Sequence, residues 1–444
     1  MTIIDVRWML PPMDLPVAII GAGPVGLAAA AELVGRGMRP IVLEAGPMAG
    51  AGMEEWGHVR VFSPWRYNVA PAARMLLERR GWSAPDPEGF PTGHELVARY
   101  LAPLAAVPEL RDAIRTGHRV RAITREGYDK LRSAGRDDAP FVLDVETYAG
   151  VRRVRARAVI DASGTTGTPN PLGAGGMPAA GEDGAAARIR YGIPDVLGRD
   201  RARYAGRRIL VVGAGHSAFT VLIDLAALRA EAPGTTISWV VRRALGASRY
   251  GGDADDALPA RGALGTRVKG LAEGPIRQTV LGITALRQDG SEVYVSDGRT
   301  EIGPFDEIVA VTGSRPDLAL FRELRVRLDQ ILEAPPALAP LIDPNHHSCG
   351  TVPPHGAAEL THPEAGFYIA GMKSYGRAPT FLMLTGYEQV RSIVAALFGD
   401  VAAARSVELV LPKTGVCSGG SDANGGCCEA PSPIISVESL SLPR

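Results

Sequence analysis

One order of apolar and polar positions occurs twice along the chain, over residues 16–46 and again over residues 206–243. Each copy begins with a short apolar run and passes through a glycine turn into a stretch long enough for a helix. Each ends in a second apolar run. This order is typical of a strand–helix–strand unit of roughly 30 residues. We therefore predict an α/β fold built on two such units.

The rest of the chain predicts shorter elements around these units. Helices are predicted over 69–81, over 93–106 and at the end of 366–399. Strand-like runs occur at 141–147, 156–162, 291–296, 305–312 and the start of 366–399. An extended connection rich in Gly, Pro and Ala is predicted for 165–205, and a loop for 244–266. From about residue 406 the chain is rich in Gly, Ser and Pro, which predicts a flexible tail.

The first glycine turn has the spacing G-x-G-x-x-G, at Gly21, Gly23 and Gly26. In a dinucleotide-binding turn these glycines permit the tight turn, the approach of the pyrophosphate and the packing of helix on strand. The helix N-terminus then faces the phosphates. Glu44 ends the second strand, 18 residues after Gly26, where an acid can bind ribose hydroxyls. The predicted cofactor residues of this unit are Gly21, Gly23, Pro24, Val25, Gly26, Glu44 and Ala45.

The second glycine turn, residues 213–218, has the variant spacing G-x-G-x-x-A, and its second strand ends in Arg242 and Arg243. A guanidinium can bind a 2′-phosphate through two hydrogen bonds, whereas an acid would repel it, so we predict NADPH rather than NADH. A solvated basic strand end is the alternative, and the phosphate could equally meet His216 or the following loop. The predicted cofactor residues are Gly213, Gly215, His216, Ser217, Ala218, Arg242 and Arg243.

Two dinucleotide units in one chain predict FAD in the first and NADPH in the second, with hydride transfer between them. The arrangement resembles the flavoproteins with two dinucleotide-binding domains, which include flavin monooxygenases, thioredoxin reductases and disulfide reductases. DASG at 161–164 and VTGSRPD at 311–317 resemble the segments where such chains leave and re-enter the FAD domain.

This resemblance implies two Rossmann-like domains, an FAD domain with an inserted NADPH domain. Its implied bounds are 1–200 and 314–405 for the FAD domain, 201–313 for the NADPH domain, and 406–444 for the tail. The further cofactor residues that it implies are Gly164, Gly313, Arg315, Gly371 and Met372.

Composition excludes several other classes of protein. Lys plus Arg and Asp plus Glu number 48 each, so the formal net charge is zero, and neither nucleic acid nor a membrane surface is expected as a partner. Four cysteines in 444 residues exclude a disulfide scaffold. The sequence shows neither an apolar stretch of ~20 residues nor a secretory signal. We expect a cytoplasmic protein acting on a small molecule, as a monomer or an oligomer.

Cysteine spacing narrows the flavin chemistry. Neither C-x-x-C nor C-x-x-x-x-C occurs in the two nucleotide-binding units, so a dithiol relay of the usual kind is absent. Reduced flavin can instead react with oxygen to give a C4a-(hydro)peroxide, a reagent for oxygen insertion. The segment GAGHSA at 213–218 resembles flavin-containing and Baeyer–Villiger monooxygenases. The long F-x-G-x-x-x-H-x-x-x-W signature is missing from 160–205, which argues against a Baeyer–Villiger enzyme.

Residues 56–68, 345–356 and 371–392 resemble the flavin-binding monooxygenases of bacterial arsenic-resistance operons. This resemblance implies a monooxygenase acting on a soft or arsenic-containing substrate. One alternative is a reductase of a thiol, a disulfide or a thiolate-bound metalloid through the tail cysteines. Another is a non-catalytic redox sensor or metallochaperone.

Four residues are candidates for catalysis. His58, Ser63 and Trp65 follow the first unit, where this class of flavoprotein often lines the isoalloxazine pocket. Lys373 stands near the position where related flavoproteins carry the acid of A-G-D. A lysine there could stabilise an anionic reduced flavin or an anionic substrate; the alternative is a solvated loop.

Two groups of residues raise the question of a metal. Cys417, Cys427 and Cys428 lie within twelve residues and could converge on trivalent arsenic or antimony, or be inert. A second group is dense in histidine but lacks the spacing of a zinc site, so lining the active site is the stronger hypothesis for it. Its members are His346, His347, Cys349 and His355.

Overall fold

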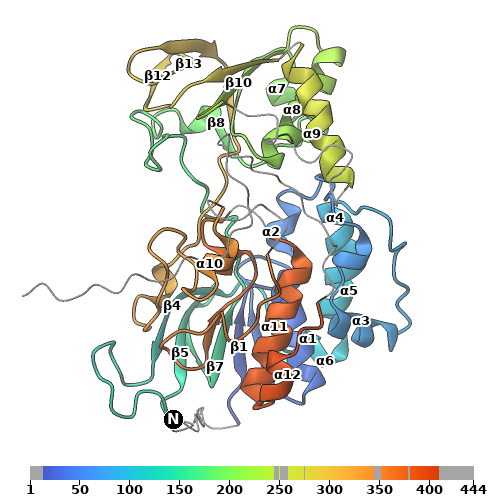
Figure 1. The fold of residues 1–444 in the computed structure, drawn as a ribbon, viewed down its shortest axis with the longest axis vertical. Coiled ribbons are helices and arrows are strands. Elements are labelled where there is room, and N and C mark those ends of the chain that lie inside the picture. Colours follow the sequence, from blue (N-terminus) through green and yellow to red (C-terminus); the bar gives the residue numbers. More distant parts are fainter. Residues whose placement is uncertain are drawn as a thin grey trace, which may run out of the picture.

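The computed structural model describes residues 14–244, 250, 259–274, 276–344, 352–378 and 381–409. Figure 1 shows two α/β units stacked along the long axis of the molecule. The chain leaves the first unit after β7 and returns to it after β15, so its C-terminal elements complete the first unit. The predicted fold class, two Rossmann-like units with one inserted into the other, is confirmed.

The first unit is built on a parallel five-stranded sheet of order β16-β7-β1-β2-β3. Its strands are β1 (Val17–Ile20), β2 (Pro40–Leu43), β3 (Ile114–Arg115), β7 (Ala158–Asp161) and β16 (Phe367–Ile369). Every residue of β1 and of β7 is buried, because helices cover one face and a second sheet covers the other. This double burial explains the continuous apolar run that precedes the first glycine turn.

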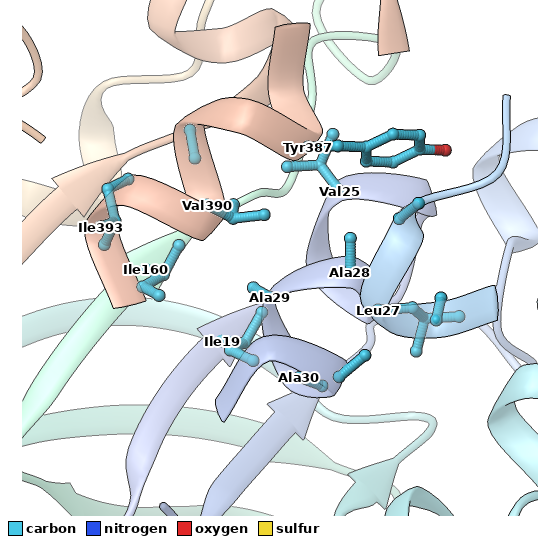
Figure 2. Packing of buried hydrophobic residues seen from close by; sticks show 14 of the residues in the cluster. Ile19, Val25, Leu27, Ala28, Ala29, Ala30, Ile160, Tyr387, Val390 and Ile393 are labelled. Carbon is cyan, nitrogen blue, oxygen red and sulfur yellow. The ribbon is translucent and has the colours of Figure 1, made fainter. Parts of the chain in front are cut away.

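Two long helices, α1 (Pro24–Gly35) and α11 (Met383–Phe398), pack on one face of this sheet. Alanines 28 to 31 of α1 are buried, and their small side chains let the helix approach both the sheet and α11. Figure 2 shows Ala29 packed with Ile19 of β1 and Val390 of α11. The alanine-rich sequence therefore encodes a helix buried on most sides.

Shorter helices complete this unit. They are α2 (Ala51–Glu54), η1 (Trp65–Tyr67), α3 (Pro71–Glu78), α4 (Gly93–Leu96), η2 (Val97–Leu101), α5 (Ala102–Ala106), α6 (Pro108–Arg111), η6 (Ala319–Phe321), α10 (Ala339–Ile342), η7 (Gly371–Tyr375) and α12 (Val401–Arg405). The helix predicted over 93–106 forms as α4, a π-helical turn and α5. Pro103 explains the interruption, because proline lacks the N–H that an α-helix needs in its interior.

An antiparallel sheet covers the other face. Its strands are β4 (Arg119–Arg125), β5 (Phe141–Thr147) and β6 (Gly150–Ala156). The sequence predicted β5 but neither β4 nor β6, whose exposed positions are rich in arginine. Phe141 and Leu143 of β5 are buried with Ile20 of β1 in one apolar cluster, which joins the two sheets.

The second unit repeats the parallel sheet, here in the order β11-β10-β9-β15-β8. Its strands are β8 (Ile189–Tyr191), β9 (Arg208–Val212), β10 (Thr236–Val241), β11 (Arg277–Val280) and β15 (Glu307–Ala310). Its helices are η3 (Ala186–Arg188), α7 (Arg201–Tyr204), α8 (His216–Glu231) and α9 (Pro259–Ala272). A small antiparallel sheet consists of β12 (Ala285–Asp289), β13 (Glu292–Ser296) and β14 (Glu301–Phe305).

Two predictions of irregular structure in this unit are wrong in part. The predicted loop 244–266 contains the first half of α9, whose glycines hid the helix. Gly265 has a structural reason, because a Cβ there would collide with the carbonyl oxygen of Tyr250. The predicted connection 165–205 contains β8 and α7, so part of the second sheet precedes the boundary predicted at residue 201. Among the described residues, no helix is long and apolar enough to cross a membrane.

Candidate cofactor sites

The first glycine turn follows β1 at the carboxyl edge of the sheet. Gly21 has φ +96°, and a Cβ on it would lie 2.8 Å from the carbonyl oxygen of Ala162. A Cβ on Gly26 would collide with the carbonyl oxygen of Gly21, so neither glycine tolerates a side chain. Gly23 differs, because no atom lies within 4 Å of its Cβ position. The structure needs the first and third glycines for packing, and the second faces open space that fits a pyrophosphate.

Helix α1 and Glu44 add polar groups to this turn. Glu44 accepts one hydrogen bond from the N–H of Ala22 and one from that of Gly46, both at 2.7 Å. Each carboxylate oxygen keeps a lone pair for a ribose hydroxyl. Pro24 begins α1, and no side chain caps the helix N-terminus. These features fit FAD. The side chain of Val25, which is 8% exposed, packs against Gly386 of α11.

The second turn divides its residues in the same way. Gly213 has φ +146°, a Cβ on it would collide with the carbonyl oxygen of Val311, and Ala218 is fully buried. Gly215 has no atom within 4 Å of its Cβ position, and α8 also lacks a side-chain cap. This open turn fits the pyrophosphate of NADPH. Ser217, in the first turn of α8, is exposed beside it.

Contacts between the units occur at the second glycine turn. The ring of His216 lies 5.5 Å from that of Phe62, which belongs to the first unit. The chain segments that join the units also pair, because Asn170 donates its N–H to the carbonyl of Gly313 and Arg315 donates its N–H to Thr168. Gly313 has φ +82°. These two hydrogen bonds therefore hold the crossover between the units.

The two arginines after β10 differ in their surroundings. Arg242 donates from Nη1 to the carbonyl oxygen of Ala174 at 3.2 Å. Arg243 is exposed and has no hydrogen bond or ion pair within the described part of the chain. Of the two guanidiniums, that of Arg243 is the more available to a 2′-phosphate.

Lys373 is buried, with 1% of its surface exposed, and it pairs with an acid on the neighbouring strand. Its Nζ lies 2.7 Å from Oδ2 of Asp161 and donates to Oγ of Ser163 at 3.1 Å. The ammonium also lies 5.0 Å from the ring centroid of Phe321. The solvated-loop alternative is therefore wrong. Asp161 already compensates the charge of Lys373, which weakens the predicted role of this lysine in stabilising an anionic reduced flavin or an anionic substrate.

The three catalytic candidates that follow the first strand–helix–strand unit, Ser63, Trp65 and His58, differ in their surroundings. Ser63 donates to Oδ1 of Asn68 at 3.0 Å, and Trp65 is 4% exposed within the main apolar cluster. Side chains buried this fully offer a ligand almost no surface, which favours a structural role for both. His58 is different, because its buried Nε2 has no hydrogen-bond partner among the described residues. It remains the candidate of the three for a polar contact to a bound group.

Comparison with known proteins identifies the family to which this chain belongs. The family model described as pyridine nucleotide-disulphide oxidoreductase matches residues 18–348. The chain belongs to this family. It is an oxidoreductase with FAD and NADPH as its cofactors.

The sequence identity between this chain and each of three similar proteins is low. A ferredoxin–NADP reductase from Salinispora tropica is 27% identical over 325 residues, which cover 71% of this chain and 79% of the relative. Bacillithiol disulfide reductase from Bacillus cereus aligns with a TM-score of 0.61 and 18% identity, over 87% of this chain and 99% of its own. A flavin-containing monooxygenase from Stenotrophomonas maltophilia aligns with a TM-score of 0.53 and 19% identity, over 87% and 98%. These structural similarities show a shared fold.

His355 supports the loop after β16 through a hydrogen bond with Gln389. Gln389 donates to Nε2 of His355 at 2.9 Å and accepts the N–H of Gly371 at 2.8 Å. The Nδ1 of His355 lies 3.1 Å from the carbonyl oxygen of Pro353 and so carries a proton. Because Nε2 accepts a hydrogen bond from Gln389, the ring has no second proton and is neutral. Burial lowers the pKa of His355 and so favours this neutral form. Met372, which follows Gly371, is half-buried.

Several sequence hypotheses fall on residues that the structure does not describe. His346, His347 and Cys349 lie outside the described residues, as do Cys417, Cys427 and Cys428. Within the described ranges, no group of three His, Cys, Asp or Glu side chains could hold a metal ion.

Sequence reasoning missed two residues that organise the carboxyl edge of the first sheet, Asp161 and Gln389. Asp161 carried a signal, since it is an acid at the end of an otherwise apolar strand. Gln389 carried none, because it is one polar residue within a helix. Gly164, three residues after Asp161, has φ +71° and an open Cβ position.

Proposed function

We propose that this oxidoreductase is an NADPH-dependent flavin monooxygenase acting on a soft or arsenic-containing substrate. The observation that carries the proposal is that no cysteine occurs before residue 349, so both nucleotide-binding units lack one. The usual disulfide branch of the family needs a thiol pair beside the flavin. Without that pair, the electrons of the reduced flavin must pass to a bound acceptor, and oxygen is the acceptor that serves a monooxygenase.

The chain's own residues hold the two nucleotides and shield the site between them. When bound, reduced FAD supplies the reactivity toward oxygen. The turn from Gly21 to Gly26, together with Glu44, would hold FAD. The turn from Gly213 to Ala218, together with Arg243, would hold NADPH. The compensated pair of Lys373 and Asp161 adds no net charge at the sheet edge, so substrate charge must be met elsewhere.

Rapid mixing distinguishes oxygenation from simple reoxidation. The protein is reduced with NADPH without oxygen and then mixed with aerated buffer while its absorbance spectrum is followed. In buffer alone we expect a separate kinetic phase between the reduced and oxidised spectra, with hydrogen peroxide released at its end. With methylarsenite we expect the second phase to be faster and little hydrogen peroxide to be released, because the oxygen atom passes to the substrate. A single phase with one equivalent of hydrogen peroxide, unchanged by arsenite or methylarsenite, would contradict the proposal.

A second candidate is a reductase that passes electrons to an external acceptor. The relative from Salinispora tropica supports it, because that protein is a ferredoxin–NADP reductase. The tail cysteines offer another route, to a thiol, a disulfide or a thiolate-bound trivalent metalloid. The triple variant Cys417→Ser, Cys427→Ser and Cys428→Ser tests this route, since serine has little affinity for soft ions. Loss of disulfide turnover and arsenite binding with normal flavin reduction would favour the reductase over the monooxygenase.

A further inference from the structure

A cleft of about 510 Å³ lies between the two units, and no residue of either glycine turn is among the residues that line it. The first unit contributes Glu55, which directly follows α2. The second unit contributes the other lining residues, Arg190, Arg199, Asp200, Arg203 and Tyr204. Figure 1 shows α2 at the junction of the units, on the side that faces the inserted one. The cleft is therefore lined mainly by arginine on one wall and by a carboxylate on the other.

Two of these arginines already have partners. Nε of Arg199 lies 3.1 Å from Oδ1 of Asp200, and Nε of Arg203 donates to Oε2 of Glu307 at 2.7 Å. Their charges are compensated by these carboxylates, so neither arginine needs a bound anion to neutralise it.

Arg190 has no partner in direct contact, although the carboxylate of Asp200, which already pairs with Arg199, attracts it over a longer distance. It makes no hydrogen bond or ion pair within the described part of the chain, and its buried Nε lacks an acceptor. A buried donor without a partner costs about 1–3 kcal/mol, and more when it is charged. The Nη groups of Arg190 also have no partner among the described residues, but they are accessible to solvent, so they are the atoms that would donate to a group bound in the cleft.

The local fold directs Arg190 into the cleft. In β8 the neighbouring residues Ile189 and Tyr191 pack on the apolar cluster around Leu210, on one face of the sheet. Alternation along a strand then sends the side chain of Arg190 to the opposite face, where Tyr204 of α7 is buried. Its direction is fixed by the strand and not by a mobile loop.

We propose that this cleft binds an oxyanion group, a carboxylate or a phosphate, with Arg190 as its main ligand. A guanidinium presents paired N–H groups that match both kinds of oxyanion. Glu55 is exposed and has no hydrogen bond or ion pair within the described residues, so the wall opposite Arg190 is negative. The anion must therefore bind on the Arg190 side, and Glu55 weakens its binding by repulsion.

Calorimetric titration of the FAD-loaded full chain tests this site. NADP⁺ is added to saturation so that the second nucleotide site is filled, and succinate or inorganic phosphate is then titrated. We expect one site per chain for at least one probe, and the preferred probe identifies the group as a carboxylate or a phosphate. Arg190→Gln should weaken binding about tenfold or more, because a charge-assisted hydrogen bond is lost.

Two further variants locate the anion. Arg201→Gln is the matched control on α7, because Arg201 pairs with Glu231 and does not line the cleft; its binding should equal that of the wild type. Glu55→Gln changes the opposite wall without touching Arg190, and it should tighten binding severalfold by removing a like charge. No binding to the wild type, equal binding to Arg190→Gln, or no effect of Glu55→Gln would overturn the proposal.

Discussion

At the scale of single residues, the buried pair of Lys373 and Asp161 changes what the lysine can do. Both side chains are essentially fully buried, and the pair ties the loop after β16 to the end of β7. A buried ion pair is costly to break, since removal of one partner leaves the other charge without compensation. The lysine therefore stabilises the sheet edge on which the flavin turn depends.

Lys373→Met should lower the free energy of unfolding by about 3–5 kcal/mol, because it leaves Asp161 buried and unpaired. The double variant with Asp161→Asn should recover much of this loss. Lys269→Met is the matched control at an exposed lysine of α9, with an expected change within about 0.5 kcal/mol. Urea unfolding followed by circular dichroism measures all three. Equal stability of Lys373→Met and Lys269→Met would show that the pair contributes nothing.

A buried histidine gives stability a pH dependence. Burial lowers the pKa of His362 to about 4, and its ring lies 3.1 Å from the carbonyl oxygen of Arg327 through Nδ1. The unfolded chain, with a histidine pKa of about 6.5, binds this proton more readily. Stability from this group is therefore complete above pH ~6.5 and is lost as the pH falls toward 4.

His362→Gln should remove up to about 3 kcal/mol of acid-dependent destabilisation, as a pKa difference of about 2.5 implies. The wild type should therefore lose more stability than the variant between pH 6.5 and 4. Urea unfolding at several pH values measures the difference between the two proteins. Parallel stability curves over that range would rule out the assigned role of His362.

The unequal contacts of two arginines predict their effects on nucleotide choice. Arg243→Ala should raise the KM for NADPH about tenfold or more and leave that for NADH nearly unchanged, since a charged hydrogen bond to the 2′-phosphate is lost. Arg242→Ala should have the smaller effect, because that guanidinium already donates to Ala174. Steady-state kinetics with both nucleotides provides the measurement. Equal effects of Arg243→Ala on NADPH and NADH would make the arginine structural.

At the scale of elements, the first glycine turn separates packing from binding. Gly26→Ala should destabilise the fold by about 1–3 kcal/mol, because its Cβ would press α1 away from the turn after β1. Gly23→Ala should leave stability unchanged, since its Cβ would enter open space. Gly23→Glu should abolish FAD binding, because a carboxylate would meet the pyrophosphate.

Unfolding curves and the flavin-to-protein absorbance ratio, measured on all three glycine variants, separate these effects. A fully yellow Gly23→Glu protein would remove the assignment of this turn to FAD. A Gly26→Ala protein as stable as the wild type would show that α1 can shift without cost.

At the scale of the whole molecule, the two units meet at the segments through which the chain crosses between them. The crossover segments pair through Asn170 and Gly313, and Phe62 contacts His216 at the start of α8. The same junction contains the cleft that Arg190 and Glu55 line from opposite units. Any change in the angle between the units would therefore alter the cleft and the second glycine turn together.

The sequence by itself determined the two nucleotide-binding turns and the elements around them. Gly21 and Gly213 have positive φ angles and backbone neighbours that exclude a Cβ, so a local spacing of glycines records the requirement directly. The strand predicted at 141–147 forms as β5, because its inward residues are apolar. Local geometry and side-chain size act over a few residues, and a sequence shows them.

Only the tertiary structure decided the charge partners and the directions of side chains. Lys373 and Asp161 are 212 residues apart, and they meet because β16 and β7 are neighbours in one sheet. The sequences of β4 and β6 are rich in arginine and resemble charged loops, and these segments form strands because they pair with β5 in a sheet that has one buried face. Arg190 likewise stands in a glycine-rich connection, and the cleft that it lines exists only once the two units are packed. Burial and charge compensation depend on which distant segments become neighbours, and local spacing does not record this.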